Sequence, residues 1–190
     1  MLNRDLYLKD PTTRTLVNEG VASVNDENLS VLRYELETFV CDGQYEKGMA
    51  HILETYLKNL GHAQQPAVWV SGFYGSGKSH LVKMLRALWV DTDFPDGATS
   101  RGIANLPESI REHLVNLSVD GKRHGGLHAA SGTLGSSSRD KSVRMALLGI
   151  LFKSVGLPEQ YPVARFVLWL RQEGLLEAVK AHVEQPGENP

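Results

Sequence analysis

The chain has 190 residues, 42% hydrophobic and 22% charged, so it is long enough to bury one proper core. Its net charge of −2 provides no global positive field that would attract nucleic acid or anionic lipid. It contains no apolar run of membrane-spanning length and no signal-peptide core, and its single cysteine, Cys41, excludes an internal disulfide, so we expect a cytoplasmic protein without membrane association.

The first third of the chain leads up to one strongly periodic helix. Residues 1–30 are polar and mixed, which predicts an irregular N-terminal arm. Residues 31–40 are ambiguous, because their apolar positions have helical spacing while their aromatic and β-branched residues favour a strand. Residues 44–60 place apolar side chains along one face and predict an amphipathic helix, which Gly61 closes as a C′ residue.

A glycine-rich loop follows, between an apolar run and another amphipathic stretch. Residues 67–71 form a short apolar run behind Pro66, which predicts a buried parallel strand. Residues 72–79 read G-x-x-x-x-G-K-S, the pattern of a nucleotide-binding P-loop. Residues 80–90 place apolar side chains on one helical face. Strand, loop and helix in this order predict an α/β fold, a P-loop NTPase with a parallel sheet at its core.

Each residue type in the loop suits the binding of phosphate. Glycine at Gly72, Gly75 and Gly77 lets the backbone approach the phosphates, and the amides of residues 75–80 cradle their oxygens at a helix N-terminus. Lys78 reaches the β- and γ-phosphates as the catalytic cation, and the Ser79 hydroxyl binds Mg²⁺. We therefore predict an ATP–Mg²⁺ site whose cofactor-binding residues include Gly72, Phe73, Tyr74, Gly75, Ser76, Gly77, Lys78, Ser79 and His80.

The rest of the chain predicts mainly helices, and we treat residues 31–190 as the N-terminal part of one P-loop ATPase domain. The predicted elements are a helix at 107–117, a turn at 120–126, a second strand at 126–134, a helix at 143–155, a helix that starts at Tyr161 and is interrupted at Gly174, and a last helix at 175–183.

Three segments resemble the BrxC/PglY family of P-loop ATPases from bacteriophage exclusion (BREX) and phage growth limitation systems. They are VLRYELETFVCDGQY at 31–45, GFYGSGKSHLVKML at 72–85 and GKRHGGLHAASG at 121–132. The resemblance implies a distant AAA-like ATPase, with this chain as the N-terminal fragment of a longer protein. It also implies self-association and partners among the other BREX components, including a DNA methyltransferase and an alkaline-phosphatase-like protein. Direct contact with DNA finds no support in the charge of the chain.

The resemblance also bears on the nucleotide base and on hydrolysis. In AAA-like ATPases a segment ahead of the loop covers the adenine, which assigns Phe39 and Val40 to the base pocket, with core packing as the alternative. Asp120 is open to interpretation as the acidic residue of a Walker B strand or as part of a helix end and turn. If the AAA topology holds, the Walker B strand lies beyond Pro190, and this fragment binds nucleotide weakly and hydrolyses it poorly.

Three functions fit the sequence. The leading one is an ATP-binding module of a phage-defence ATPase, in which hydrolysis drives conformational change or complex assembly. The first alternative is a non-catalytic interaction or oligomerisation module that nucleotide stabilises. The second is a P-loop kinase, although no acceptor-binding carboxylate or arginine lid stands out in the sequence.

Overall fold

The computed structural model of the protein describes residues 28–134 and 142–184. The chain divides into two compact units, Met1–Ala129 and Ala130–Pro190. This division falls inside the range 31–190 that the sequence analysis treats as one domain. The predicted N-terminal arm lies, up to residue 27, outside the described residues.

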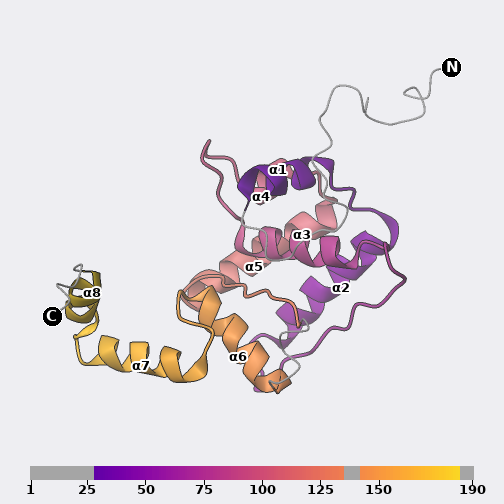
Figure 1. The fold of residues 1–190 in the computed structure, drawn as a ribbon. Coiled ribbons are helices and arrows are strands. Elements are labelled where there is room, and N and C mark those ends of the chain that lie inside the picture. The colour runs from indigo at the N-terminus through magenta and orange to yellow at the C-terminus, as the bar shows by residue number, and fades with distance from the viewer. Residues whose placement is uncertain (1–27, 135–141, 185–190) are drawn as a thin grey trace. The chain divides into compact units, whose positions relative to one another are not determined.

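The first unit is a group of helices around one apolar core (Figure 1). Its helices are α1 (Leu29–Thr38), α2 (Gly43–Asn59), α3 (Lys78–Val90), α4 (Ser100–Ile103) and α5 (Glu108–Arg123). Helices α2 and α5 pack side by side, α3 contacts α4 and α5, and α1 contacts α4. The fully buried apolar side chains come from four of these helices: Leu36, Met49, Leu53, Met84, Leu88, Ile110, Leu114 and Leu117.

Local sequence signals explain where the first helices begin and end. The Asn28 side chain caps α1 by accepting hydrogen bonds from the amides of Ser30 and Val31, at 3.1 and 3.4 Å. Helix α1 therefore resolves the ambiguity of residues 31–40 in favour of a helix. Helix α2 confirms the predicted amphipathic helix, and Gly61 follows it with a positive φ of 88°.

The predicted α/β fold with a parallel sheet is wrong. The structure has no sheet in the part of the chain that it describes, where the β pairing is a single bridge between Asp93 and Thr99. Neither predicted strand, at 67–71 or at 126–134, forms a strand, and the Trp69 side chain is 89% exposed. An apolar run becomes a buried strand only where neighbouring strands form hydrogen bonds with its backbone amides and carbonyls. The sequence pattern of the run does not reveal whether such neighbouring strands exist.

The predicted turn at 120–126 is also displaced, because α5 continues to Arg123. Gly121 is buried inside this helix, and a Cβ there would lie 2.5 Å from the Leu127 side chain. The absence of a side chain thus lets Leu127 pack against the helix. The turn comes only at Gly125 and Gly126, which have positive φ angles of 85° and 115°.

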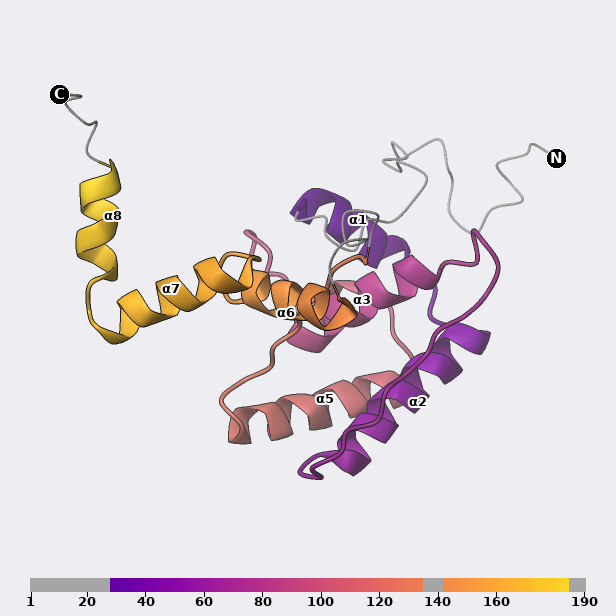
Figure 2. The same ribbon diagram turned by 60° about the horizontal axis from the view of Figure 1, so that its bottom comes forward.

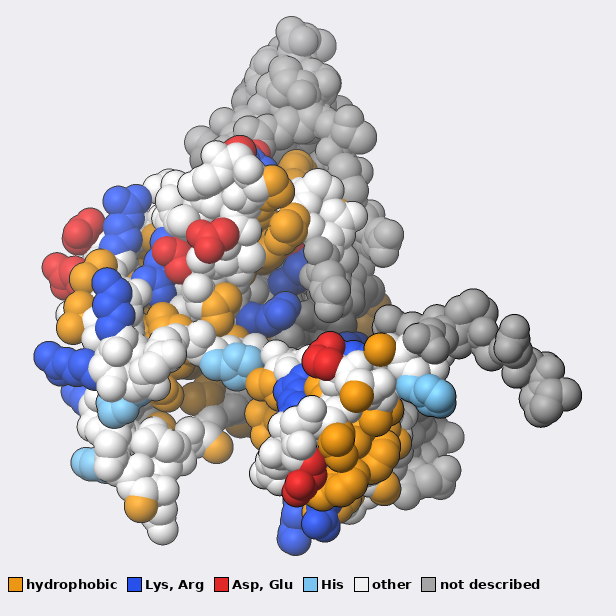
Figure 3. Space-filling model, turned by 90° about the vertical axis from the view of Figure 1, so that its left-hand side faces the viewer, with side chains coloured by type: hydrophobic (Ala, Val, Ile, Leu, Met, Phe, Trp, Pro, Cys, Tyr) orange, Lys and Arg blue, Asp and Glu red, His pale blue; other side chains and the backbone are white. Residues whose placement is uncertain are grey.

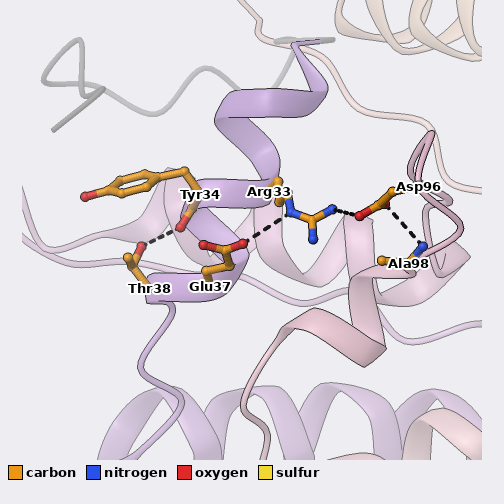
Figure 4. A network of polar contacts seen from close by, with 6 residues as sticks. All are labelled: Arg33, Tyr34, Glu37, Thr38, Asp96 and Ala98. Atoms are coloured by element: carbon orange, nitrogen blue, oxygen red, sulfur yellow. Dashed lines mark hydrogen bonds and ion pairs between the residues drawn. The ribbon is translucent and has the colours of Figure 1, made fainter. Parts of the chain in front are cut away.

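A polar network fastens α1 to the loop that follows α3 (Figure 4). The Arg33 guanidinium donates to Asp96 at 2.7 Å and to Glu37 at 3.2 Å. Asp96 also accepts from the Ala98 amide at 3.3 Å, and this bond, with the Arg33 contact, lowers the pKa of the Asp96 carboxyl. The network is exposed to solvent, so its value lies in orienting α1 more than in stability.

A partly buried arginine holds the C-terminal end of α3. The Arg101 guanidinium donates to the Leu88 and Trp89 carbonyls at 2.7 and 2.9 Å, and to the Leu114 carbonyl of α5 at 2.9 Å. It also donates to the Ser118 hydroxyl. These carbonyls of α3 have no acceptor role inside the helix, so a cation at this end satisfies them and complements the helix dipole. Burial lowers the pKa of Arg101.

The second unit contains α6 (Val143–Ser154), α7 (Tyr161–Gln172) and α8 (Leu176–Glu184), which confirm the three helices predicted there. Ser142 caps α6, and Gly156 and Gly174 end α6 and α7 with positive φ angles. Its buried apolar side chains are Leu157, Ala164 and Leu170, while many others on these helices are exposed. Figure 3 shows hydrophobic side chains gathered at the molecular surface.

None of the helices in the two described segments has the length and apolar character that crossing a bilayer requires.

Candidate phosphate-binding site

The glycine-rich loop joins the extended residues after α2 to the start of α3 (Figure 2). The Ser76 amide donates to the Phe73 carbonyl at 3.2 Å, which closes a tight turn. Gly75 and Gly77 follow with positive φ angles of 80° and 79°, a backbone region that side chains disfavour. The loop therefore needs glycine at these two positions, and the pattern in the sequence corresponds to a real backbone requirement.

The Lys78 side chain lies across this loop. Its ammonium donates to the carbonyls of Gly72 and Phe73, at 3.0 and 2.7 Å, and lies 3.4 Å from the Ser76 hydroxyl oxygen. The three donors of the ammonium are thus directed at the loop from the first residue of α3. A positive charge is held at the place where the sequence predicts the phosphates.

The N-terminal end of α3 offers backbone donors beside this charge. Gly77 is the N-cap residue and has no side chain with which to cap the helix. The amides of Lys78, Ser79 and His80 belong to the first turn, where helix geometry supplies no intrahelical acceptor. Ser79 is exposed on that turn. The loop thus combines an ammonium, several amides and a hydroxyl within one turn of helix.

Tyr45 of α2 supports the loop from behind. Its hydroxyl donates to the Ser76 carbonyl at 2.9 Å. A Cβ on Gly77 would overlap this hydroxyl, so the close approach of the tyrosine requires glycine there. The Tyr45 ring also meets the Phe39 ring edge-on, with centroids 6.3 Å apart. The loop conformation is therefore tied to α2 and to the core.

An open cavity of about 490 Å³ lies between α2 and the chain that leads into the loop, and we call it the α2 cavity. Its apolar and aromatic lining consists of Tyr45, Ile52, Val68, Trp69, Val70, Phe73 and Leu81. Gln44, His51 and Ser71 add polar groups, and Gly72, Ser76 and Lys78 belong both to the loop and to the cavity lining.

Phe39 and Val40, which the resemblance assigns to the base pocket, occupy different environments. Phe39 is buried in the core and contacts the His80 ring edge-on at 5.6 Å, whereas Val40 is 63% exposed. Neither residue lines the α2 cavity. Their role in binding a base stays a prediction.

Two aspartates that follow apolar stretches take part in local contacts. Asp91 ends α3 in the left-handed region, with φ of 51°, and accepts from the Arg101 amide at 3.0 Å. Asp120 lies inside α5 and pairs with Arg123 at 3.1 Å, so it does not end a strand. No cluster of three His, Cys, Asp or Glu residues that could hold a metal occurs in the described ranges.

Helix α3 also carries a buried ion pair on the side facing α1. The Lys83 ammonium lies 2.6 Å from Glu35, and the two side chains are 4% and 16% exposed. The nearby His80 ring is partly buried, which lowers its pKa; the Glu35 charge opposes this shift and Lys83 reinforces it. These groups hold α1 against the first turns of α3, behind the loop.

Sequence reasoning missed the role of Tyr45. Its apolar spacing within α2 marked it only as one more residue of the buried face. A tyrosine at such a position does carry a hydroxyl that needs a partner, but the sequence does not identify the Ser76 carbonyl as that partner.

The sequence matches no protein-family model, and no solved structure matches the chain. A proposal for the function of the chain therefore rests on the loop and the residues around it.

Proposed function

We propose that the chain binds ATP with Mg²⁺ through the loop at residues 72–79. The observation that carries this proposal is the position of Lys78, whose ammonium is held across the loop at the uncapped N-terminus of α3. Helix N-termini favour anions because their free amides and the helix dipole both present positive charge.

Phosphate would be a stronger partner for Lys78 than its present ones. In the structure the ammonium bonds to two neutral carbonyls, of Gly72 and Phe73. A phosphate oxygen carries a negative charge and adds a Coulomb attraction to the ammonium that a neutral carbonyl lacks, so phosphate oxygens would displace these carbonyls. The Ser79 hydroxyl would then hold the Mg²⁺ that bridges the phosphates, completed by water.

We expect binding without efficient turnover. Hydrolysis needs a carboxylate or equivalent group that orients the attacking water. The residues described as lining the α2 cavity beside Lys78 include no aspartate or glutamate. This observation favours, as a second candidate, a non-catalytic module that nucleotide stabilises. A steady-state rate of ATP hydrolysis that is robust and lost in Lys78→Ala would exclude that second candidate.

The direct test is a calorimetric titration of the chain with Mg-ATP. Lys78→Ala should weaken binding about a hundredfold, the value of one strong charged contact. Lys58→Ala is the matched control, because Lys58 is 70% exposed near the C-terminal end of α2 and pairs with Glu54 of the same helix. Equal affinity for wild-type protein and Lys78→Ala would contradict the proposal.

The biological setting that we propose is phage defence. Its support is the sequence resemblance of residues 31–45, 72–85 and 121–132 to BREX ATPases. The partners would then be other BREX components and further copies of the chain. The corresponding test is phage challenge of the host that carries this protein, where Lys78→Ala should lower resistance and Lys58→Ala should not.

A further inference from the structure

We infer that the α2 cavity receives the base and ribose of the nucleotide whose phosphates the loop binds. This inference rests on the proposed function, which concerns the phosphates of ATP, and adds the site that holds the rest of the nucleotide. It also assigns the base to other residues than Phe39 and Val40.

Continuity between cavity and loop is the first argument. Gly72, Ser76 and Lys78 line the α2 cavity and belong to the loop itself. A triphosphate held by Lys78 therefore has the cavity directly beside it. The volume of about 490 Å³ lies within the range of roughly 300–1,000 Å³ that is usual for small-molecule pockets.

The aromatic lining is the second argument. Trp69 and Phe73 both line the cavity, yet their side chains are 89% and 91% exposed. Rings that contribute so little to the core are available to a ligand, and a base presents a flat aromatic face on which they can stack. Val68 and Ile52 add apolar surface that a polyphosphate alone would not use.

Polar groups on the α2 side are the third argument. Gln44 and His51 both line the cavity from α2. A glutamine amide both donates and accepts hydrogen bonds, as the edge of a nucleobase does. A mostly apolar pocket with a few such groups is typical of sites that hold and orient a small organic ligand.

Gly48 of α2 allows the cavity to be filled without damage to the fold. This glycine lines the cavity, and a Cβ there would meet no heavy atom within 4 Å. Leucine and alanine are both better helix formers than glycine, so neither replacement should destabilise α2. Gly48→Leu fills part of the cavity, and Gly48→Ala is the matched control with the same gain in helix propensity.

The experiment compares the affinities of Mg-ATP and Mg-tripolyphosphate for each variant by calorimetry. We expect wild-type protein to bind ATP about tenfold more tightly than tripolyphosphate, the value of one stacked base. Gly48→Leu should remove this advantage and leave tripolyphosphate binding unchanged, while Gly48→Ala keeps both. Trp69→Ala, at an exposed position, should also lower ATP affinity about tenfold and spare tripolyphosphate.

The outcomes separate the two proposals. If ATP and tripolyphosphate bind equally well, or if Gly48→Leu leaves ATP binding intact, the role of the α2 cavity is refuted while the phosphate site stands. If neither ligand binds wild-type protein, the phosphate site fails and the cavity assignment fails with it.

Discussion

The two ends of α3 differ in how their unpaired backbone groups are treated. At the C-terminal end, the partly buried Arg101 donates hydrogen bonds to the Leu88 and Trp89 carbonyls and to the Leu114 carbonyl of α5. At the N-terminal end, the N-cap residue Gly77 has no side chain, and the amides of the first turn beside Lys78 have no intrahelical acceptor. One helix thus has a closed end that stabilises the unit and an open end that is suited to an anion.

The largest expected effect comes from removing the Arg101 guanidinium at the C-terminal end of α3. Arg101→Met removes four hydrogen bonds made by a partly buried guanidinium and should lower the free energy of unfolding by about 3 kcal/mol in urea titrations. Arg123→Met, at a 72% exposed position, should change it by less than about 0.5 kcal/mol. Similar losses in the two variants would mean that the C-terminal end of α3 is not fastened by Arg101.

The second prediction concerns the backbone at the N-terminal end of α3. Gly77→Ala must adopt a φ of 79° and also overlap the Tyr45 hydroxyl, so it should cost about 2 kcal/mol and weaken Mg-ATP binding more than tenfold. Gly75→Ala has a similar φ of 80° but open space around it, and it should lose only about 1 kcal/mol.

A double variant distinguishes the two causes in Gly77→Ala. Adding Tyr45→Phe removes the overlapping hydroxyl, so the loss of stability in the double variant should be smaller than the sum of the losses in Gly77→Ala and Tyr45→Phe. Strictly additive losses would show that backbone strain alone explains the effect of Gly77→Ala.

The third prediction concerns the support of the loop. Tyr45→Phe keeps the ring contact with Phe39 but removes the hydrogen bond to the Ser76 carbonyl. It should lower the free energy of unfolding by about 1 kcal/mol and weaken Mg-ATP binding about fivefold. Tyr56→Phe on the same helix, measured alongside, should leave Mg-ATP binding unchanged; a similar loss there would argue against a specific role of Tyr45.

The smallest expected effect is a pH dependence at the open end. Burial lowers the pKa of His80 below its unfolded value of about 6.5, so the unfolded chain binds the proton more readily. Stability from this residue is therefore complete above about pH 6.5 and is lost as the pH falls toward the folded pKa. His80→Phe should flatten that part of the stability–pH curve; an unchanged curve would assign the dependence to other groups.

Periodic patterns in the sequence predicted most of the helices. The apolar face of residues 44–60 corresponds to α2, and the spacing within residues 143–155 corresponds to α6. The polar residues at 120–126 predicted a turn at the wrong place. Gly121 lies within α5, where the absence of a side chain leaves room for Leu127, and it does not form a turn. The sequence alone does not reveal whether a glycine is needed for a positive φ angle or for the close approach of another side chain.

The candidate site was predictable in part. The glycine pattern located the two positive φ angles at Gly75 and Gly77 and the lysine that lies across the loop. Tyr45 was not predictable as a partner of the loop, nor Arg101 as a partner of α3, because each donates to a residue at least twelve positions away in the chain. Such contacts depend on packing, which local patterns do not encode.

The sequence by itself determined the helical periods and the loop chemistry, since both arise from the spacing of neighbouring residues. Only the tertiary structure decided whether the apolar residues 67–71 would find strand partners, and in the described chain they line a cavity instead. The physical reason is that a strand's amides and carbonyls are satisfied by other segments, whereas a helix satisfies most of its own.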